Sequence, residues 1–219
     1  MKEVKKAIIV ANGKIENLAQ IKQNISTLGF SCPDLIISAD GGAKNTLLLG
    51  LLPQTVIGDM DSIDPETKAM LQNKKTTFVQ ESPSKDYTDT HLAVREAVGQ
   101  GAEKIIILGA VGGRTDHELA NIMLLADPFL AGRDIKIISG TEEIFTVCRP
   151  ATVQGVKGKQ ISLFSLTPYT FFTGTTGLKY KLENEKLLFS PVRGISNEFS
   201  SPQARLDISE GILLVIKQL

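Results

Sequence analysis

The stretch KIIILGAVGGRTDHELA, residues 104–120, decides the fold. Its β-branched run at 105–108 is typical of a strand that is buried on both faces of a parallel sheet. Three glycines and an arginine follow this run, and a helical pattern occupies residues 117–125. A strand, a glycine-rich loop and a helix in this order predict one unit of an open α/β sheet.

The same alternation continues on both sides of this stretch. Asp64-Pro65 is a helix start, with a side-chain cap followed by proline at the first helical position. Strand and helix patterns alternate up to about residue 140, which predicts a Rossmann-like α/β domain with a mostly parallel sheet. The remaining strands are predicted at 7–10, 35–38, 55–57, 76–79 and 135–138, and the remaining helices at 17–28, 43–49, 65–72 and 88–98.

The pattern changes near residue 140. Short runs separated by turns, with partial alternation and no long helical period, predict an all-β C-terminal sandwich or barrel, of which we favour the sandwich. Thr173-Gly174 and Glu183-Asn184 are among the predicted turns. We therefore expect two domains, 1–142 and 143–219. The predicted strands of the second domain are 144–147, 160–164, 178–182, 186–189, 204–208 and 212–216.

Composition excludes several classes of partner. The 219 residues include 24 basic and 24 acidic side chains, so no net field attracts nucleic acid or an anionic membrane. The apolar run near the N-terminus is too short for a signal peptide, and no run approaches a membrane span. Cys32 and Cys148 lack metal-ligand spacing and are expected to be reduced thiols. These features predict a cytoplasmic protein.

Aspartates cluster at the predicted strand ends. Because ligands of an open α/β sheet bind outside the carboxyl ends of the strands, these aspartates predict a site for Mg²⁺ and phosphate. No P-loop or GxGxxG sequence is present, so any nucleotide is held in another way. The acidic motifs are ADGG at 39–42, GDMDS at 58–62, KDYTD at 85–89 and GGRTDH at 112–117.

Each motif also has a purely structural interpretation. Asp40 and its two glycines would form a simple turn, and Asp86 would cap a helix with Asp89 in its first turn. Asp59 and Asp61 have no such role, and two carboxylates this close favour a bound cation.

The glycine loop and the two histidines complete the candidates. Arg114 offers a two-pronged donor for phosphate, and Asp116 or Thr115 would cap the following helix. His117 is expected to give polar support to the phosphate site, whereas His91 is expected at the surface or in packing.

Together these motifs resemble the thiamine pyrophosphokinase family over nearly the whole chain. The family's hallmarks occur here in the family's order, and two later segments resemble its thiamine-binding sandwich. The matching segments are ADGGA at 39–43, GDMDS at 58–62, the Asp pair at 86 and 89, GAVGGRTDH at 109–117, GLKY at 177–180 and GISN at 194–197.

The resemblance implies that the thiamine hydroxyethyl oxygen attacks the β-phosphorus of ATP, which gives thiamine diphosphate and AMP. It also implies a homodimer whose active site is shared between subunits. The implied catalytic residues are Asp59, Asp61, Asp86, Asp89 and Arg114, with Mg²⁺ held by Asp59, Asp61 and Asp89. The implied nucleotide site is Asp40, Gly41, Gly42, Gly112, Gly113, Arg114, Asp116 and His117, and the implied thiamine site is Tyr180, Ser196 and Asn197.

Two alternatives stay open at this point. The GDMDS loop is similar to the DxD loop of Mg²⁺-dependent phosphatases, although the all-β second domain fits that class poorly. A non-catalytic thiamine or nucleotide sensor would use the same fold, although the acidic set is complete. Formation of AMP that depends on both ATP and thiamine separates these alternatives from the transferase.

Overall fold

The computed structural model describes residues 5–82, 84 and 86–219. The chain forms two compact units, of which the first ends at Gly140 and the second comprises Thr141–Leu219. Lys85, the first residue of the KDYTD motif, and residues 1–4 lie outside the described residues.

The first unit is built on a parallel sheet of β-branched and other aliphatic residues. β1 pairs with β2 and with β5, so that Ala7 lies opposite both Leu35 and Ile105. The strand order is β6-β5-β1-β2-β3-β4, and the direction of chain progression reverses between β1 and β5. The strands are β1 (Lys6–Val10), β2 (Leu35–Ala39), β3 (Thr55–Gly58), β4 (Thr77–Gln80), β5 (Lys104–Leu108) and β6 (Asp134–Ile138).

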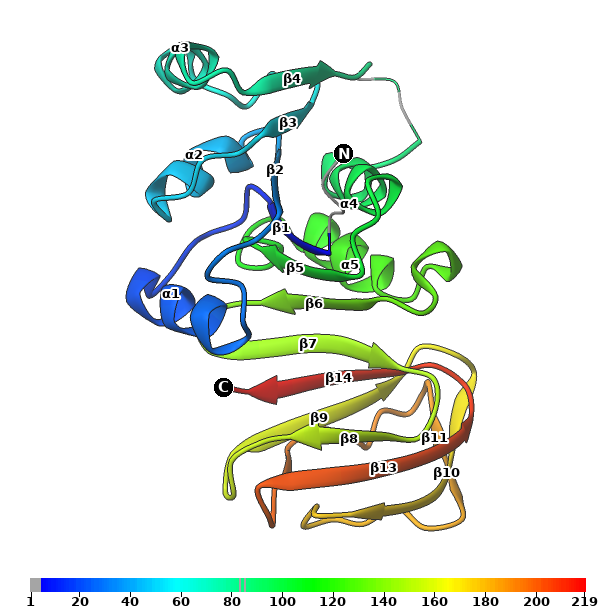
Figure 1. Ribbon diagram of the computed structural model, residues 1–219. Coiled ribbons are helices and arrows are strands. Elements are labelled where there is room, and N and C mark those ends of the chain that lie inside the picture. Colours follow the sequence, from blue (N-terminus) through cyan, green and yellow to red (C-terminus); the bar gives the residue numbers. More distant parts are fainter. Residues whose placement is uncertain (1–4, 83, 85) are drawn as a thin grey trace. The chain divides into compact units, whose positions relative to one another are not determined.

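Helices connect these strands and cover both faces of the sheet. Figure 1 shows α1 and α2 on one face and α4 and α5 on the other. As predicted, Asp64 caps α3, since its Oδ1 accepts a hydrogen bond from the Thr67 amide at 2.8 Å. The helices are α1 (Leu18–Thr27), α2 (Gly42–Leu48), α3 (Pro65–Asn73), α4 (Asp89–Gly99) and α5 (Thr115–Leu124), with a 3₁₀ turn η1 (Pro128–Leu130).

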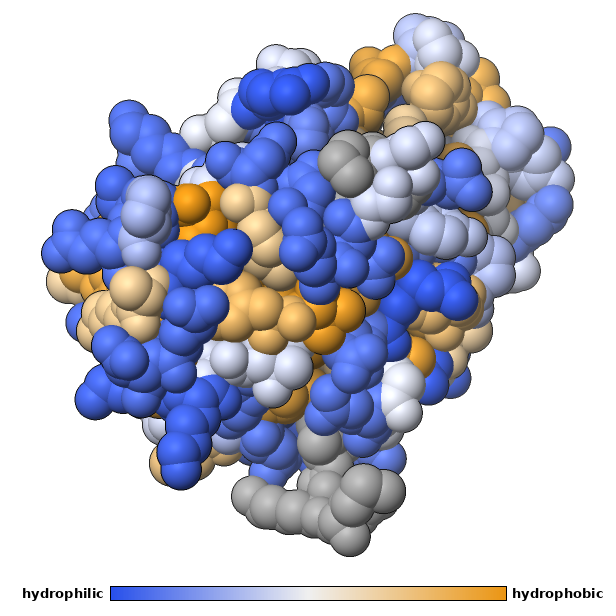
Figure 2. All heavy atoms as spheres, turned by 90° about the horizontal axis from the view of Figure 1, so that it is seen from above, coloured by the Kyte–Doolittle hydropathy of each residue, from blue (hydrophilic) through white to orange (hydrophobic). Residues whose placement is uncertain are grey.

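The last strand at one edge differs from the prediction. β4 was predicted as a strand buried on both faces, but Thr77, Val79 and Gln80 are exposed and Phe78 is half-buried. This prediction is wrong because β4, among the described strands, pairs only with β3 at the end of the sheet, where an edge strand is covered less than a central one. Figure 2 views the molecule from above, where hydrophilic residues surround smaller hydrophobic areas.

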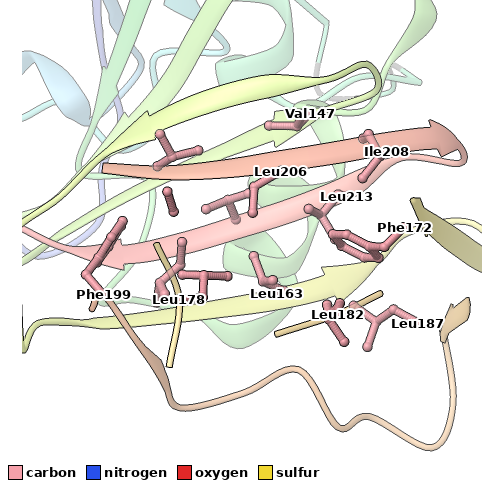
Figure 3. Packing of buried hydrophobic residues seen from close by; sticks show 14 residues of the cluster. Val147, Leu163, Phe172, Leu178, Leu182, Leu187, Phe199, Leu206, Ile208 and Leu213 are labelled. Carbon is pink, nitrogen blue, oxygen red and sulfur yellow. The ribbon is translucent and has the colours of Figure 1, made fainter. Parts of the chain in front are cut away.

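The second unit is an all-β sandwich. One sheet has the order β11-β10-β13-β8, and the strands β12, β9, β14 and β7 pair antiparallel in that order. Phe172, Phe199 and Leu206 are fully buried between them (Figure 3). The strands are β7 (Glu142–Val147), β8 (Ala151–Gln154), β9 (Gln160–Ser165), β10 (Tyr169–Thr176), β11 (Glu185–Leu188), β12 (Asn197–Glu198), β13 (Gln203–Glu210) and β14 (Leu213–Gln218).

One predicted strand of this unit does not form, and the strands β8, β10 and β12 were not predicted. Residues 178–182 form no strand, and Leu178 makes only an isolated bridge with Phe199. The eight-residue strand β10 was missed because Thr173-Gly174 was interpreted as a turn. Gly174 instead lies inside β10, at an irregularity in its pairing with β13, where a glycine accommodates the bulge.

The fold class itself is confirmed: an α/β unit with a mostly parallel sheet is followed by an antiparallel β unit. Cys32 and Cys148 are free and exposed. Within the part of the chain that the structure describes, no helix has both the length and the apolar character needed to cross a membrane.

Candidate active site

A cavity of about 780 Å³ opens at the carboxyl ends of the central strands of the first unit. Its wall contains residues that directly follow β1, β2 and β5, where an open α/β sheet binds its ligands. Of the predicted site residues, the cavity is lined by Asp40, Asp86, Asp89, Gly113, Arg114 and His117. Among the described residues, the lining does not include Gly41, Gly42, Asp59, Asp61, Gly112 or Asp116.

The floor of this cavity is main chain packed against main chain. The amide of Gly13 donates to the carbonyl of Gly109 at 2.7 Å, and a Cβ at Gly13 would collide with that carbonyl oxygen. Likewise, a Cβ at Gly42 would collide with the carbonyl oxygen of Val10. Gly42 therefore allows close packing of backbone against backbone, and Gly41 beside it leaves room for the side chain of Asn12.

Two asparagines that the sequence analysis did not select hold this floor. The Asn45 amide group donates to the carbonyls of Ala11 and Gly13 at 2.9 and 2.8 Å. The buried Asn121 side chain donates to the carbonyl of Ala110 at 2.9 Å. Their signal in the sequence was an asparagine on the helix that follows each glycine-containing loop.

Three carboxylates from three separate segments of the chain meet at the cavity. Asp40, Asp59 and Asp89 each offer an oxygen, and these oxygens lie within 4.8 Å of one another. Asp40 follows β2, Asp59 follows β3, and Asp89 is the first residue of α4. Gly58 makes room for them, since a Cβ there would lie 2.7 Å from the Asp40 Cβ and 3.2 Å from the Asp89 Cγ.

The buried member of this cluster is Asp40, which is 6% exposed. Its Oδ2 accepts from the Ser62 amide at 3.2 Å, while Oδ1 has no hydrogen-bond partner among the residues that the structure describes. Burial raises the pKa of Asp40, and the nearby charges of Asp89 and Asp59 raise it further, against the lowering effect of Ser62. An oxygen in this state is suited to a cation, which would supply the missing partner.

Asp61, the other predicted metal ligand of the GDMDS loop, lies outside the three-carboxylate cluster. Its side chain is exposed and accepts from the Ser62 hydroxyl at 2.9 Å. Met60, between the two aspartates, has a left-handed φ of 67°, and the Asp61 amide donates to Oδ1 of Asp59 at 3.3 Å.

Residues of the KDYTD motif form part of the cavity wall at the start of α4. Thr88 is the N-cap, and its hydroxyl accepts from the His91 amide at 3.2 Å. The alternative in which Asp86 caps this helix is therefore wrong, because Thr88 lies two residues closer to the first helical residue. Asp86 is exposed on the wall of the cavity, and Asp89 lies in the first turn of α4.

The side chain of Arg114 is held by Asp116, in the first turn of the helix that follows it. Its Nε and Nη2 donate to Asp116 at 3.1 and 2.6 Å, and this pairing lowers the pKa of the Asp116 carboxyl. The prediction that Asp116 or Thr115 caps the helix is wrong, since α5 already begins at Thr115 and Arg114 occupies the cap position without a side-chain bond.

The two histidines lie in different environments. His91 packs between the rings of Tyr87 and Phe129, with centroid distances of 4.4 and 5.5 Å. Its side chain is only 16% exposed, and burial lowers its pKa. Its predicted packing role is confirmed. His117 is exposed and lines the cavity beside Arg114.

In the second unit, Asn197 organises the predicted thiamine-site residues. Its buried side chain accepts from the Tyr180 amide at 3.0 Å and donates to the Tyr180 carbonyl at 2.7 Å. Tyr180 is 61% exposed, and Nζ of Lys179 lies 5.7 Å from the centroid of its ring. Ser196 is exposed, with a left-handed φ of 56° and an amide that donates to the Ser162 hydroxyl.

The parallel sheet with an acidic, glycine-containing cavity at its switch point places the chain among the α/β proteins that bind a ligand at the carboxyl ends of their strands. Two family models match it in succession. "Thiamin pyrophosphokinase, catalytic domain" matches residues 28–138, and "Thiamin pyrophosphokinase, vitamin B1 binding domain" matches residues 149–213. The chain belongs to the thiamin pyrophosphokinase family, whose members are ATP-dependent diphosphotransferases.

Relatives with this name cover most of the chain. Thiamine pyrophosphokinase of Bacillus subtilis is 28% identical over 186 residues, which span 84% of this chain and 86% of the relative. Thiamine pyrophosphokinase 1 of Oryza sativa is 26% identical, with 96% and 86% covered. The crystal structure of the Bacillus subtilis protein superimposes with a TM-score of 0.83 at 26% identity, covering 98% of this chain and 99% of that one.

Proposed function

We propose that this chain transfers the pyrophosphoryl group of ATP to the hydroxyethyl oxygen of thiamine. The observation that supports this proposal most directly is that three carboxylates meet at a cavity lined also by Arg114 and a glycine loop. Family membership supports the same reaction. The thiamine oxygen bonds to the β-phosphorus, the bond from that phosphorus to the α-phosphate oxygen breaks, and AMP leaves.

Mg²⁺ fits the carboxylate cluster. Three carboxylates offer oxygens within 4.8 Å of one another, and one of the three, Asp40, has a buried oxygen without a partner among the described residues. Such a set suits a hard divalent cation. Asp40, Asp59 and Asp89 would hold it, and the sequence adds Asp61 as a further ligand or as a ligand through water. Bound there, the ion would neutralise charge on the phosphate oxygens.

The other residues of the cavity position the reactants. Arg114 would turn from Asp116 to the phosphate groups and offset the charge that develops on them. Asp86 and Asp89 both line the cavity, and one or the other would orient the attacking hydroxyl or take up its proton. Phosphoryl-type transfer requires chiefly such positioning and charge neutralisation.

The thiamine ring is assigned to the second unit. The exposed ring of Tyr180 offers a surface for stacking, and Ser196 offers a hydroxyl for the aminopyrimidine. Asn197, whose amide group is engaged with the backbone of Tyr180, would act chiefly by fixing that ring.

A homodimer with a shared active site and a cytoplasmic location are further parts of the proposal. Both come from the family resemblance and from the sequence. Light scattering at several protein concentrations tests the first, since the 23.7 kDa chain would give twice this mass as a dimer.

Product analysis tests the reaction. Purified protein is incubated with ATP, Mg²⁺ and thiamine, and the products are separated by chromatography. We expect AMP and thiamine diphosphate in equal amounts, and neither product without thiamine or Mg²⁺. ADP with thiamine monophosphate would move the attack to the γ-phosphorus. Release of inorganic phosphate would indicate a phosphatase, and thiamine binding without turnover would indicate a sensor.

A further inference from the structure

Two backbone amides of the glycine loop share one carboxylate oxygen. The amides of Gly112 and Gly113 donate to Oε1 of Glu118 at 2.9 and 2.5 Å. Glu118 lies in the first turn of α5, and its own amide donates to the carbonyl of Arg114 at 3.0 Å. The side chain therefore joins the residues before Arg114 to the helix after it.

This bridge restrains the glycine loop. Gly112 has a φ of 88°, in the left-handed region, and glycine at this position gives the loop many alternative conformations. On the other side, the Gly112 carbonyl accepts from the Lys14 amide at 3.2 Å. With both contacts made, the path of the chain into Arg114 is determined.

The same bridge changes what the loop offers a phosphate group. Successive amides that converge on one point form an anion site, and here the anion is a side chain of the chain itself. Because the amides of Gly112 and Gly113 donate to Glu118, the group of this loop that remains to contact a phosphate is the guanidinium of Arg114. Arg114 and Glu118 both line the cavity.

We propose that Glu118 is a positioning residue for the transfer reaction. It holds the glycine loop in the conformation that presents Arg114 to the cavity, and it does so without touching the substrate. This inference rests on the proposed function, since that function assigns Arg114 to the phosphate groups. Loss of the bridge leaves Arg114 on a mobile loop and weakens the binding of ATP.

Binding of α,β-methylene-ATP with Mg²⁺, measured by titration calorimetry, tests the proposal. This analogue replaces the bridge that would break, so it binds without turnover. Glu118→Ala removes two hydrogen bonds to a charged acceptor and is expected to weaken binding about tenfold or more. Glu118→Gln keeps an acceptor oxygen and is expected to restore binding to within about threefold of the wild type.

Glu66→Ala is the matched control, because Glu66 is an exposed glutamate in the first turn of α3. It should bind the analogue as the wild type does. In turnover assays, Glu118→Ala should raise the KM for ATP and leave the KM for thiamine unchanged. If Glu118→Ala fails to fold, Glu118→Asp replaces it, since its shorter side chain keeps the charge but withdraws the oxygen from the amides.

Two results would overturn the proposal. Tighter binding by Glu118→Ala would mean that the carboxylate competes with phosphate, and unchanged binding would mean that the bridge does not matter. Failure of the proposed function has a different signature: the wild type would bind the analogue but form no thiamine diphosphate.

Discussion

At the scale of single residues, the approach of three acidic side chains is the central feature of the first unit. Asp40, Asp59 and Asp89 would repel one another in the absence of a cation, and one of them is buried. This repulsion therefore lowers the free energy of unfolding of the metal-free protein, as is common where a site is arranged to bind a ligand.

Replacement of Asp59 by asparagine should abolish most turnover. The change removes a charge from the proposed Mg²⁺ site and keeps the size of the side chain, so we expect kcat/KM to fall by about 10² or more with the fold intact. The assay is AMP formation over a series of Mg²⁺ concentrations, with circular dichroism to check folding. Asp207→Asn, on β13 of the second unit, is the control. Near-normal activity in Asp59→Asn would remove this residue from the metal site.

Asp61→Asn belongs in the same series. The sequence predicts that it also abolishes turnover, although its exposed carboxylate lies outside the cluster of three.

Asp40→Asn should stabilise the metal-free protein. Asparagine still accepts a hydrogen bond from the Ser62 amide but brings no charge beside Asp59 and Asp89. We expect the Tm without Mg²⁺ to rise by about 2–5 °C, measured by calorimetry. Saturating Mg²⁺ should raise the Tm of the wild type more than that of the variant. A lower Tm for metal-free Asp40→Asn would contradict the proposed repulsion.

At the scale of elements, the start of α4 links stability to the site. The Thr88 hydroxyl caps this helix and thereby sets the direction of Asp89. Thr88→Ala should lower the free energy of unfolding by about 1 kcal/mol, measured by urea denaturation. Thr88→Ser keeps the hydroxyl and is expected to lose much less. Equal losses in both variants would assign the effect to the methyl group instead.

The packing of α4 should also make stability depend on pH. Because the pKa of His91 is lowered in the folded state, the unfolded chain takes up the proton first as the pH falls. The contribution of His91 is thus fully present above its ordinary pKa, about 6.5, and is lost below it. His91→Gln should flatten the decline in unfolding free energy between about pH 7 and 5. His117→Gln, at the other histidine of the chain, should retain it.

At the scale of the whole molecule, the sequence predicts those features of the fold that depend on regular hydrophobic periodicity. Aliphatic runs such as 105–108 locate the parallel strands, and the loops at their carboxyl ends follow from the geometry of the sheet. The approach of Asp40 to Asp59 follows in part from this geometry, since both residues end neighbouring strands.

Other features depend on contacts that no local pattern reveals. β10 contains a bulge whose glycine has the composition of a turn, and Glu118 contacts two amides only because Gly112 takes a left-handed conformation. Asn45 was missed for a similar reason, because its partners are backbone carbonyls more than thirty residues away.

A buried ion pair joins two neighbouring strands of the second unit. Lys217 and Glu143 lie opposite each other on β14 and β7, with Nζ and Oε2 2.8 Å apart and both side chains nearly inaccessible. Lys217→Met removes the cation beside the buried Glu143 carboxylate and should reduce the free energy of unfolding by about 3–5 kcal/mol. The double variant Lys217→Met, Glu143→Leu should recover most of this loss. Guanidinium denaturation checks both, and a double variant as weak as the single one would contradict this account.

The glycine floor of the cavity has a consequence for redesign. Gly13 and Gly109 line the cavity, and a side chain at either position would collide with a backbone carbonyl oxygen, so neither position can be varied. The shape of the cavity at these glycines is set by the backbone that follows β1 and β5. A library that aims at another nucleotide should therefore vary the rim, at Tyr87 and His117, and leave the floor as it is.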